Sequence, residues 1–181
     1  PDGLSIRSFG GAPIALDRTL RRLQTLAFSP AGTRLAVVRN GSTDDQPTGD
    51  TDIVIYEQHA GSWRRAARHT VFGARQENDA AFLSRDRLLV DFQVIDLASG
   101  AVAPAPAIGL SAVSADGQTL LFNGGDGTAQ WARIVDGELG PLVDAVRPQA
   151  FANRGLPVAI SPQAQVLWCT GTACGLGLEP R

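Results

Sequence analysis

Lysine and methionine are both absent from the 181-residue chain, and every basic residue is arginine. The lack of lysine indicates a GC-rich bacterial genome and says nothing of mechanism. A chain that starts at Pro1 without methionine is expected to be a processed product or part of a longer protein. No apolar run approaches the length of a membrane span, so membrane insertion is not expected. The net charge of −2 disfavours nucleic acid as a partner.

Motifs for common catalytic chemistries are missing as well. The sequence has no phosphate-binding P-loop, no dinucleotide fingerprint and no zinc-protease helix. The segment from Gly109 to Val113 departs from the nucleophile-elbow pattern, because valine stands at its last position. His59 and His69, the only histidines, fall in a predicted turn and at the end of a predicted strand. We therefore predict no catalytic residue, no cofactor and no metal ligand within the chain.

A repeat is present instead. The segment LAFSPAGTRLAVV, from Leu26 to Val38, holds two β-patterned runs around a Ser-Pro-Ala-Gly turn. Related segments begin at Ala81, Ala112 and Ala159. Counted from residue 27, the steps between copies are 54, 31 and 47 residues, irregular but close to the period of blade-like repeats. The apolar run at 35–38 is typical of a strand covered on both faces.

A second hairpin follows each of the first three copies, with turns at 59–61, 98–100 and 136–137. Two hairpins per repeat predict a four-stranded antiparallel blade, and radially arranged blades make a β-propeller. The predicted fold class is all-β, a single β-propeller domain of about four repeats over 1–181. The expected blades are 1–23 (partial), 24–75, 76–106, 107–150 and 151–181 (partial). The two partial blades could close a ring onto each other or be the cut edges of a larger ring.

These residues resemble a known family. The run from Phe28 to Ala36, FSPAGTRLA, and the later DIVIY run at 52–56 resemble the WD40-like (TolB-type, PD40) propeller repeats of bacterial proteins. The Trp-Asp and Gly-His pairs of strict WD40 repeats are missing. The resemblance covers most of the chain and implies the propeller fold without fixing a function. The alignment of the repeat copies makes Phe28, Val113 and Ile160 equivalent, and we expect them to face inward in successive sheets around a common axis.

Cys169 and Cys174 are the only cysteines. A hairpin would bring their Cα atoms within the roughly 4.4–6.8 Å that a disulfide needs. A disulfide would imply an oxidising compartment, and therefore a periplasmic or secreted protein, whereas two free thiols would fit the cytoplasm. The sequence leaves both states open.

Polar segments offer other candidate sites. Residues 40–51 lack apolar side chains and are expected to form a mobile surface loop. Its acidic residues do not have the spacing of a calcium loop, which favours a plain acidic loop: Asp44, Asp45, Asp50 and the adjoining Asp52. Glu77-Asn78-Asp79 precedes an inner strand, where propeller hydrolases carry metal-binding groups. The matching positions of the other repeats are mostly apolar or small, so no convergent metal site is expected. The arginines at 18, 21 and 22 are interpreted as a solvated crossover between blades.

Three function hypotheses follow. The first is a non-catalytic propeller module that gives a protein–protein interaction or scaffolding surface, bound by another protein or by another domain of its own polypeptide. The second is a regulatory or substrate-gating domain of an enzyme whose catalytic segment lies outside this chain. The third is a secreted carbohydrate-binding propeller with Trp63, Trp131 and Trp168 as stacking platforms, although strand tryptophans are usually core residues.

Overall fold

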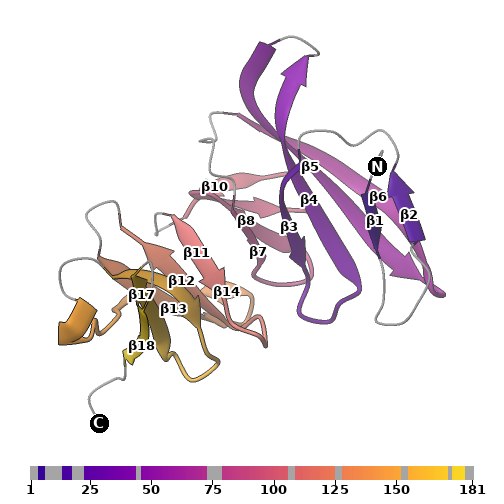
Figure 1. The fold of residues 1–181 in the computed structure, drawn as a ribbon. Helices are drawn as coiled ribbons and strands as arrows, with labels where there is room; N and C mark the ends of the chain where they lie inside the picture. The colour runs from indigo at the N-terminus through magenta and orange to yellow at the C-terminus, as the bar shows by residue number, and fades with distance from the viewer. Residues whose placement is uncertain are drawn as a thin grey trace. The chain divides into compact units, whose positions relative to one another are not determined.

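The computed structural model describes residues 4–6, 14–17, 23–43, 46–72, 79–105, 109–124, 128–151, 155–170 and 173–177 (Figure 1). These residues form strands and one short 3-10 helix, and none of their helices is long and apolar enough to cross a membrane. The chain divides into two compact units, Pro1–Asn78 and Asp79–Arg181, which are described one at a time.

The described residues of the first unit form two antiparallel sheets. A two-stranded hairpin pairs β1 (Leu4–Ile6) with β2 (Ile14–Asp17). The larger sheet has the order β3-β4-β5-β6, with each strand paired to the next one in sequence. Its strands are β3 (Leu23–Phe28), β4 (Arg34–Thr43), β5 (Gln46–His59) and β6 (Ser62–Phe72). A simple up-and-down meander of this kind is the local arrangement that two successive hairpins predict.

The central strands of this sheet are buried on both faces, as the continuous apolar run predicts. On one face Leu35 and Val37 of β4 pack with Val54 and Tyr56 of β5. Leu16 of β2 and Trp63 of β6 pack against this group. The alternate residues point the other way and are also buried: Ala36, Val38, Ile53 and Ile55.

The expected surface loop at 40–51 is wrong. Strand β4 continues to Thr43 and β5 starts at Gln46, so this stretch forms a paired ribbon. Asn40 lies opposite Thr51 and Thr43 lies opposite Gln46. Low apolar content shows that a segment is not core, but the backbone can still pair with its neighbour. Asp44 and Asp45 lie outside the described residues.

The described residues of the second unit form three antiparallel sheets in chain order (Figure 1). The first has the order β10-β9-β8-β7, from β7 (Ala80–Phe82), β8 (Arg87–Val90), β9 (Gln93–Asp96) and β10 (Val102–Pro104). The next contains β11 (Leu110–Val113), β12 (Thr119–Asn123), β13 (Ala129–Val135), β14 (Glu138–Leu139) and β15 (Val143–Asp144). After the 3-10 helix η1 (Gln149–Phe151), the last sheet has the order β16-β17-β18, from β16 (Leu156–Ile160), β17 (Val166–Thr170) and β18 (Ala173–Gly177).

Neighbouring sheets of this unit pack face to face. Leu120 and Phe122 of β12 join a buried cluster with Leu89 and Val94 of the preceding sheet. The intervening residue of β12, Leu121, points the other way into a cluster with the last sheet. The fold of the described residues is therefore all-β, with four antiparallel sheets of three to five strands, as in propeller blades, beside the two-stranded β1–β2 hairpin. The blade boundaries themselves stay a prediction.

Strand pairing makes the three reference positions equivalent, because Phe28, Val113 and Ile160 each pair with the first core residue of the next strand. Their environments differ. Ile160 is 7% exposed, whereas Phe28 is 50% exposed and Val113 is 42% exposed. The expectation that all three face inward is wrong for Phe28 and Val113. All three residues lie on an edge strand, where burial depends on what lies beside that strand, and of the three Ile160 joins a buried cluster.

Candidate functional site

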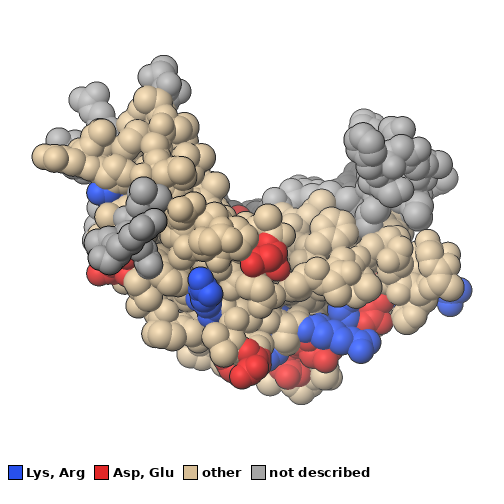
Figure 2. Space-filling view, turned by 90° about the horizontal axis from the view of Figure 1, so that it is seen from below, with Lys and Arg blue, Asp and Glu red and all other residues tan. Residues whose placement is uncertain are grey.

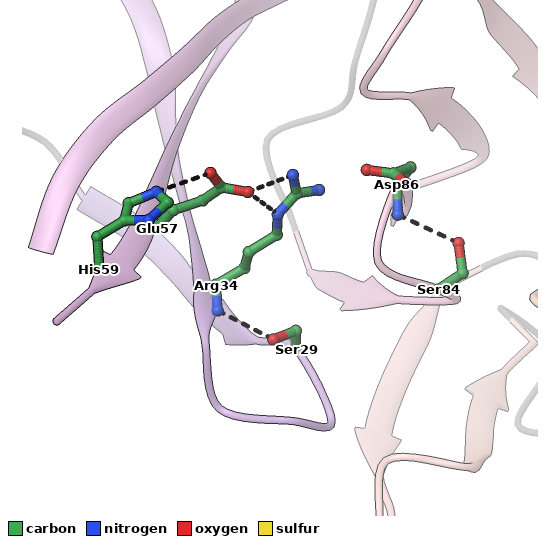
Figure 3. Close-up of polar contacts among 6 residues, drawn as sticks. All are labelled: Ser29, Arg34, Glu57, His59, Ser84 and Asp86. Atoms are coloured by element: carbon green, nitrogen blue, oxygen red, sulfur yellow. Dashed lines mark hydrogen bonds and ion pairs between the residues drawn. The ribbon is translucent and has the colours of Figure 1, made fainter. Parts of the chain in front are cut away.

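A serine side chain closes the turn of three repeats. In the first copy, Ser29 Oγ accepts a hydrogen bond from the backbone N–H of Arg34 at 3.0 Å, and the Ser29 N–H donates to the Arg34 carbonyl at 2.9 Å (Figure 3). Ser114 makes the same two contacts with Thr119, both at 2.9 Å. Ser161 makes them with Gln165, at 3.1 Å and 2.9 Å. The repeated Ser is thus explained by turn closure, which gives it a structural role.

The residue three positions after this serine has a left-handed backbone. Gly32 has φ +66°, Gly117 has φ +70°, and Ala164 takes the same conformation with φ +61°. Only glycine adopts this region without a steric cost. In the copy that begins at Ala112, the side chain of Asp116 adds two hydrogen bonds to the turn. Its Oδ1 accepts one from Ser114 Oγ at 2.6 Å and one from the Gln118 N–H at 3.0 Å. The Ser114 bond and the Gln118 bond hold the pKa of Asp116 below its ordinary value.

The copy that begins at Ala81 has a shorter turn of the same kind. The Ser84 N–H donates to the Arg87 carbonyl at 3.3 Å, and Ser84 Oγ accepts from the Asp86 N–H at 3.3 Å (Figure 3). The serine therefore closes its turn even where the sequence of the repeat has diverged.

A charged group lies beside the first turn. Arg34 of β4 and Glu57 of β5 are directly opposite in the strand register and form an ion pair, and His59 Nε2 lies 3.4 Å from Glu57 Oε2 (Figure 3). The Arg34 and Glu57 side chains are 14% and 17% exposed. Arg34 and Glu57 thus form a cross-strand ion pair that stabilises the end of the β4–β5 pair beside the turn.

A second charged cluster spans three strands of the same sheet. The carboxylate of Asp52 accepts hydrogen bonds from Arg68 Nη2 at 2.7 Å, Arg39 Nη2 at 2.9 Å and Thr70 Oγ1 at 3.0 Å. Burial by itself would raise the pKa of Asp52. The bonds from Arg68 and Thr70, with the charges of Arg68 and Arg39, outweigh burial and lower its pKa. Two arginines already bind the Asp52 carboxylate, so this side chain has a structural role. Asp52 is therefore not a free ligand for a metal ion in the acidic segment.

The other acidic candidates do not gather into a site. Asp79 is exposed just before β7, whereas Glu77 and Asn78 lie outside the described residues, as do Arg18, Arg21 and Arg22. Within the described residues, no group of three His, Cys, Asp or Glu side chains is arranged to hold a metal ion. His69 lies on β6, where burial lowers its pKa and its Nε2 is buried without a partner.

The tryptophans are packing residues. Trp168 is 1% exposed; its Nε1–H donates to the Val146 carbonyl at 3.2 Å, and the Arg147 guanidinium carbon lies 4.7 Å from the ring centroid. Trp131 packs against the same cluster. The Trp63 ring packs edge-on against Phe28, with centroids 6.1 Å apart. Trp168 is therefore closed to a sugar, which weakens the carbohydrate hypothesis.

Cys169 and Cys174 are joined by a disulfide between directly paired positions of β17 and β18. The bond lies on the side of the last sheet that faces away from Trp168, because neighbouring residues on a strand project from opposite faces. It ties the edge strand β18 to the middle of its sheet.

The sequence reasoning missed an apolar surface on the last sheet. Leu156 and Val158 of β16 and Leu176 of β18 are 56%, 46% and 56% exposed. Leu176 pairs with Leu167, and Leu156 pairs with Cys169, so these residues share the face that carries the disulfide. Ala159 pairs with Leu167 and lies on the same face, whereas Val158 lies at a register shift of β16. The name "following face" is used below for Leu156, Ala159, Leu167 and Leu176. The signal was present in the sequence, because β16, β17 and β18 contain no charged residue.

Outside the following face, positively and negatively charged residues are mixed with uncharged ones on the surface that Figure 2 shows. On the face shown in Figure 2, the described arginine and acidic side chains lie among uncharged ones, and several lie next to a side chain of opposite sign. Arg87 and Glu138, for example, form an ion pair between neighbouring sheets of the second unit. The visible face therefore offers mixed charge.

Comparisons with known proteins identify the fold. No protein-family model and no curated protein sequence matches the chain. TolB from Acinetobacter baumannii is similar in structure, with a TM-score of 0.53 and 14% identity over 91% of this chain and 42% of TolB. A puromycin-hydrolyzing peptidase from Mycobacterium tuberculosis is similar with a TM-score of 0.52 and 17% identity, over 93% of this chain and 30% of the peptidase. The chain spans less than half of either protein, and identities this low show the fold alone.

Proposed function

We propose that this chain is a non-catalytic β-propeller module that offers a binding surface to another protein or to another domain of its polypeptide. The observation that carries the proposal is the uncharged following face, on which Leu156 and Leu176 are each 56% exposed. Contiguous exposed apolar side chains on a soluble protein usually mark an interaction site. The serine turns and the Asp52 cluster supply rigidity, since their polar groups are occupied by the fold itself.

The test is affinity capture from an extract of the cells that carry the gene, with three immobilised baits. Wild-type chain and Val135→Glu should retain the same partner, because Val135 is an exposed valine of β13 outside the following face. Leu156→Glu should lose that partner, because a charge would be buried on binding. If no protein depends on Leu156, the proposal is wrong for a separate protein as the partner.

A second candidate is a gating or regulatory domain of an enzyme. It is supported by the likeness to the peptidase, because the similar region is only 30% of that protein. Mass spectrometry of the native polypeptide tests this candidate. A longer polypeptide with a catalytic segment would favour it, and a mature chain of this length would count against it.

A further inference from the structure

Strand β18 lies at the edge of the last sheet, and none of its described side chains is buried in the core. Ala173, Cys174 and Leu176 are exposed, and Gly175 is half-buried. A glycine inside a strand also weakens it, because it has no side chain to pack and loses more conformational freedom on folding. A Cβ added at Gly175 would clash with the Phe151 ring, so this ring packs directly on the backbone of β18. Side-chain packing therefore gives β18 little hold on its sheet.

In the sheets of four and five strands, the third strand is anchored by buried side chains. These side chains include Ile53 and Ile55 of β5, Val94 and Ile95 of β9, and Ala132 and Ile134 of β13. Strand β18 is the third strand of its sheet and has a covalent link in place of this packing. The Cys169–Cys174 disulfide joins it to β17 at directly paired positions. The position of β18 therefore depends on the redox state of two cysteines.

The disulfide is accessible on the following face. Cys174 is exposed and Cys169 is half-buried, and Cys169 pairs on its other side with Leu156. An exposed disulfide can be reached by an attacking thiolate, and disulfides of this kind are more readily reduced than buried ones. The two cysteines are five positions apart in the sequence, so the loop that they close is short. A short loop restricts the unfolded chain less than a long one, which concentrates the effect of this bond on β18.

We propose that the Cys169–Cys174 disulfide is a reversible redox switch that fixes β18 in its sheet when oxidised and releases it when reduced. Oxidation holds Leu176 beside Leu167, so the following face is complete. Reduction leaves β18 to its backbone pairing and the Phe151 contact, so the strand opens more often and Leu176 leaves the face. The inference rests on the proposed function, because it names the regulation of that binding surface: the oxidised chain binds the partner and the reduced chain releases it.

The reductant of the switch is a dithiol, and the exchange balances without another reagent. One thiolate of the dithiol attacks Sγ of the exposed Cys174, the S–S bond breaks, and Cys169 leaves as a thiolate that takes up a proton. The second thiol of the dithiol attacks the mixed disulfide and releases Cys174 as a thiol. Two electrons and two protons thus pass from the dithiol to the protein, and the dithiol becomes a disulfide. Oxidation of the chain reverses these steps.

The test is hydrogen exchange of the native chain, measured by mass spectrometry before and after treatment with millimolar dithiothreitol. A thiol assay on a parallel sample without denaturant reports the reduction itself. Exchange of the amides in 173–177 should rise about tenfold or more on reduction, the factor that corresponds to the loop-closure entropy of so short a loop. Exchange in β12 should stay unchanged, because the sheet that contains it has no cysteine.

A chain that carries both Cys169→Ser and Cys174→Ser is the matched control. It should show fast exchange at 173–177 with and without dithiothreitol, which separates loss of the bond from other effects of the reagent. A disulfide that stays intact in dithiothreitol until the chain unfolds overturns the inference. A reduced chain with unchanged exchange at β18, or with an equal rise in β12, overturns it as well, because the bond would then have a purely structural role.

Capture from the cell extract links the switch to the binding surface. The partner that depends on Leu156 should stay on the oxidised bait and elute with dithiothreitol, and the bait with both serines should not retain it. Retention by the reduced bait overturns the regulation while the proposed function stands. An extract without a Leu156-dependent partner counts against the proposed function, and exchange at β18 then decides by itself whether the disulfide is a switch.

Discussion

Replacing Gly32 by alanine, and making the reverse change at Ala164, tests how strongly the repeated turn sets the stability of its sheet. The two residues hold equivalent places after the turn serine, with φ +66° and φ +61°. Their surroundings differ. A Cβ added at Gly32 would meet no atom within 4 Å, whereas Ala164 is 4% exposed within the cluster around Trp168.

The Gly32→Ala substitution is expected to cost roughly 1 kcal/mol of unfolding free energy. An L-residue in the left-handed region costs about 1–2 kcal/mol. Alanine also restricts the unfolded chain and thereby returns about 0.5–1 kcal/mol. Open space around the new methyl group adds no clash, so the backbone conformation alone determines the result.

The Ala164→Gly substitution is expected to be nearly neutral, although it relieves the same backbone strain. The relief of about 1–2 kcal/mol is opposed by two losses. The buried methyl group contributes about 0.8 kcal/mol, and the greater freedom of glycine in the unfolded chain costs about 0.5–1 kcal/mol. The sum of the losses is close to the gain.

Urea unfolding followed by tryptophan fluorescence measures both changes. Trp63 reports on the unit that contains Gly32, whereas Trp131 and Trp168 report on the unit that contains Ala164. A Gly32→Ala chain as stable as wild type would refute the left-handed turn. An Ala164→Gly chain stabilised by more than about 1 kcal/mol would show that the alanine methyl is not buried as the structure has it.

Three other predictions use polar groups. Ala31 stands two residues after Ser29, as Asp116 does after Ser114. Ala31→Asp should therefore allow the same bond to the turn serine and raise the melting temperature in calorimetry, and Asp116→Ala should lower the melting temperature. The pKa of Asp52 lies below its ordinary 3.8, so its ion pairs stabilise the fold above pH 3.8 and are lost as pH falls through the lower folded value. Asp52→Asn should therefore unfold about 1–3 kcal/mol more easily at pH 7, with a flatter acid dependence in urea titrations at stepped pH. Burial lowers the pKa of His69 from 6.5, so the fold holds it neutral and loses stability as pH falls from 6.5 through the lower folded value. His69→Gln should remove that part of the pH dependence, and an unchanged slope would contradict it.

The fold could be read from the sequence because its signals are local. A serine three residues before a glycine forms one turn through its own side chain and backbone, without help from distant residues. The Asp136–Gly137 turn between β13 and β14 is equally local, with φ +52° and φ +77°. Turn chemistry repeated along a chain therefore predicts a meander of hairpins before any packing is known.

The ion pairs could not be read in the same way. Asp52 meets Arg39 and Arg68, which are 13 and 16 residues away, only because the strand register places them on adjacent strands. The polar composition at 40–51 could not show that the backbone pairs along β4 and β5. Register depends on turn length and on which face is buried, and both depend on the folded sheet.

The first large sheet and the last sheet differ in a way that fits the proposed binding surface on the last sheet. Strand β6, the outer strand of the first large sheet, carries arginines, and the buried Asp52 of that sheet forms ion pairs with Arg39 and with Arg68. The last sheet has no charge, is one strand shorter than the four-stranded sheets, and ties its edge strand with a disulfide. Fixing β18 in register would matter little if that sheet merely faced water, since an edge strand there can fray without consequence. It matters if the leucines beside the disulfide must meet another surface in one alignment, because a slip of a single residue would turn Leu176 away from that surface.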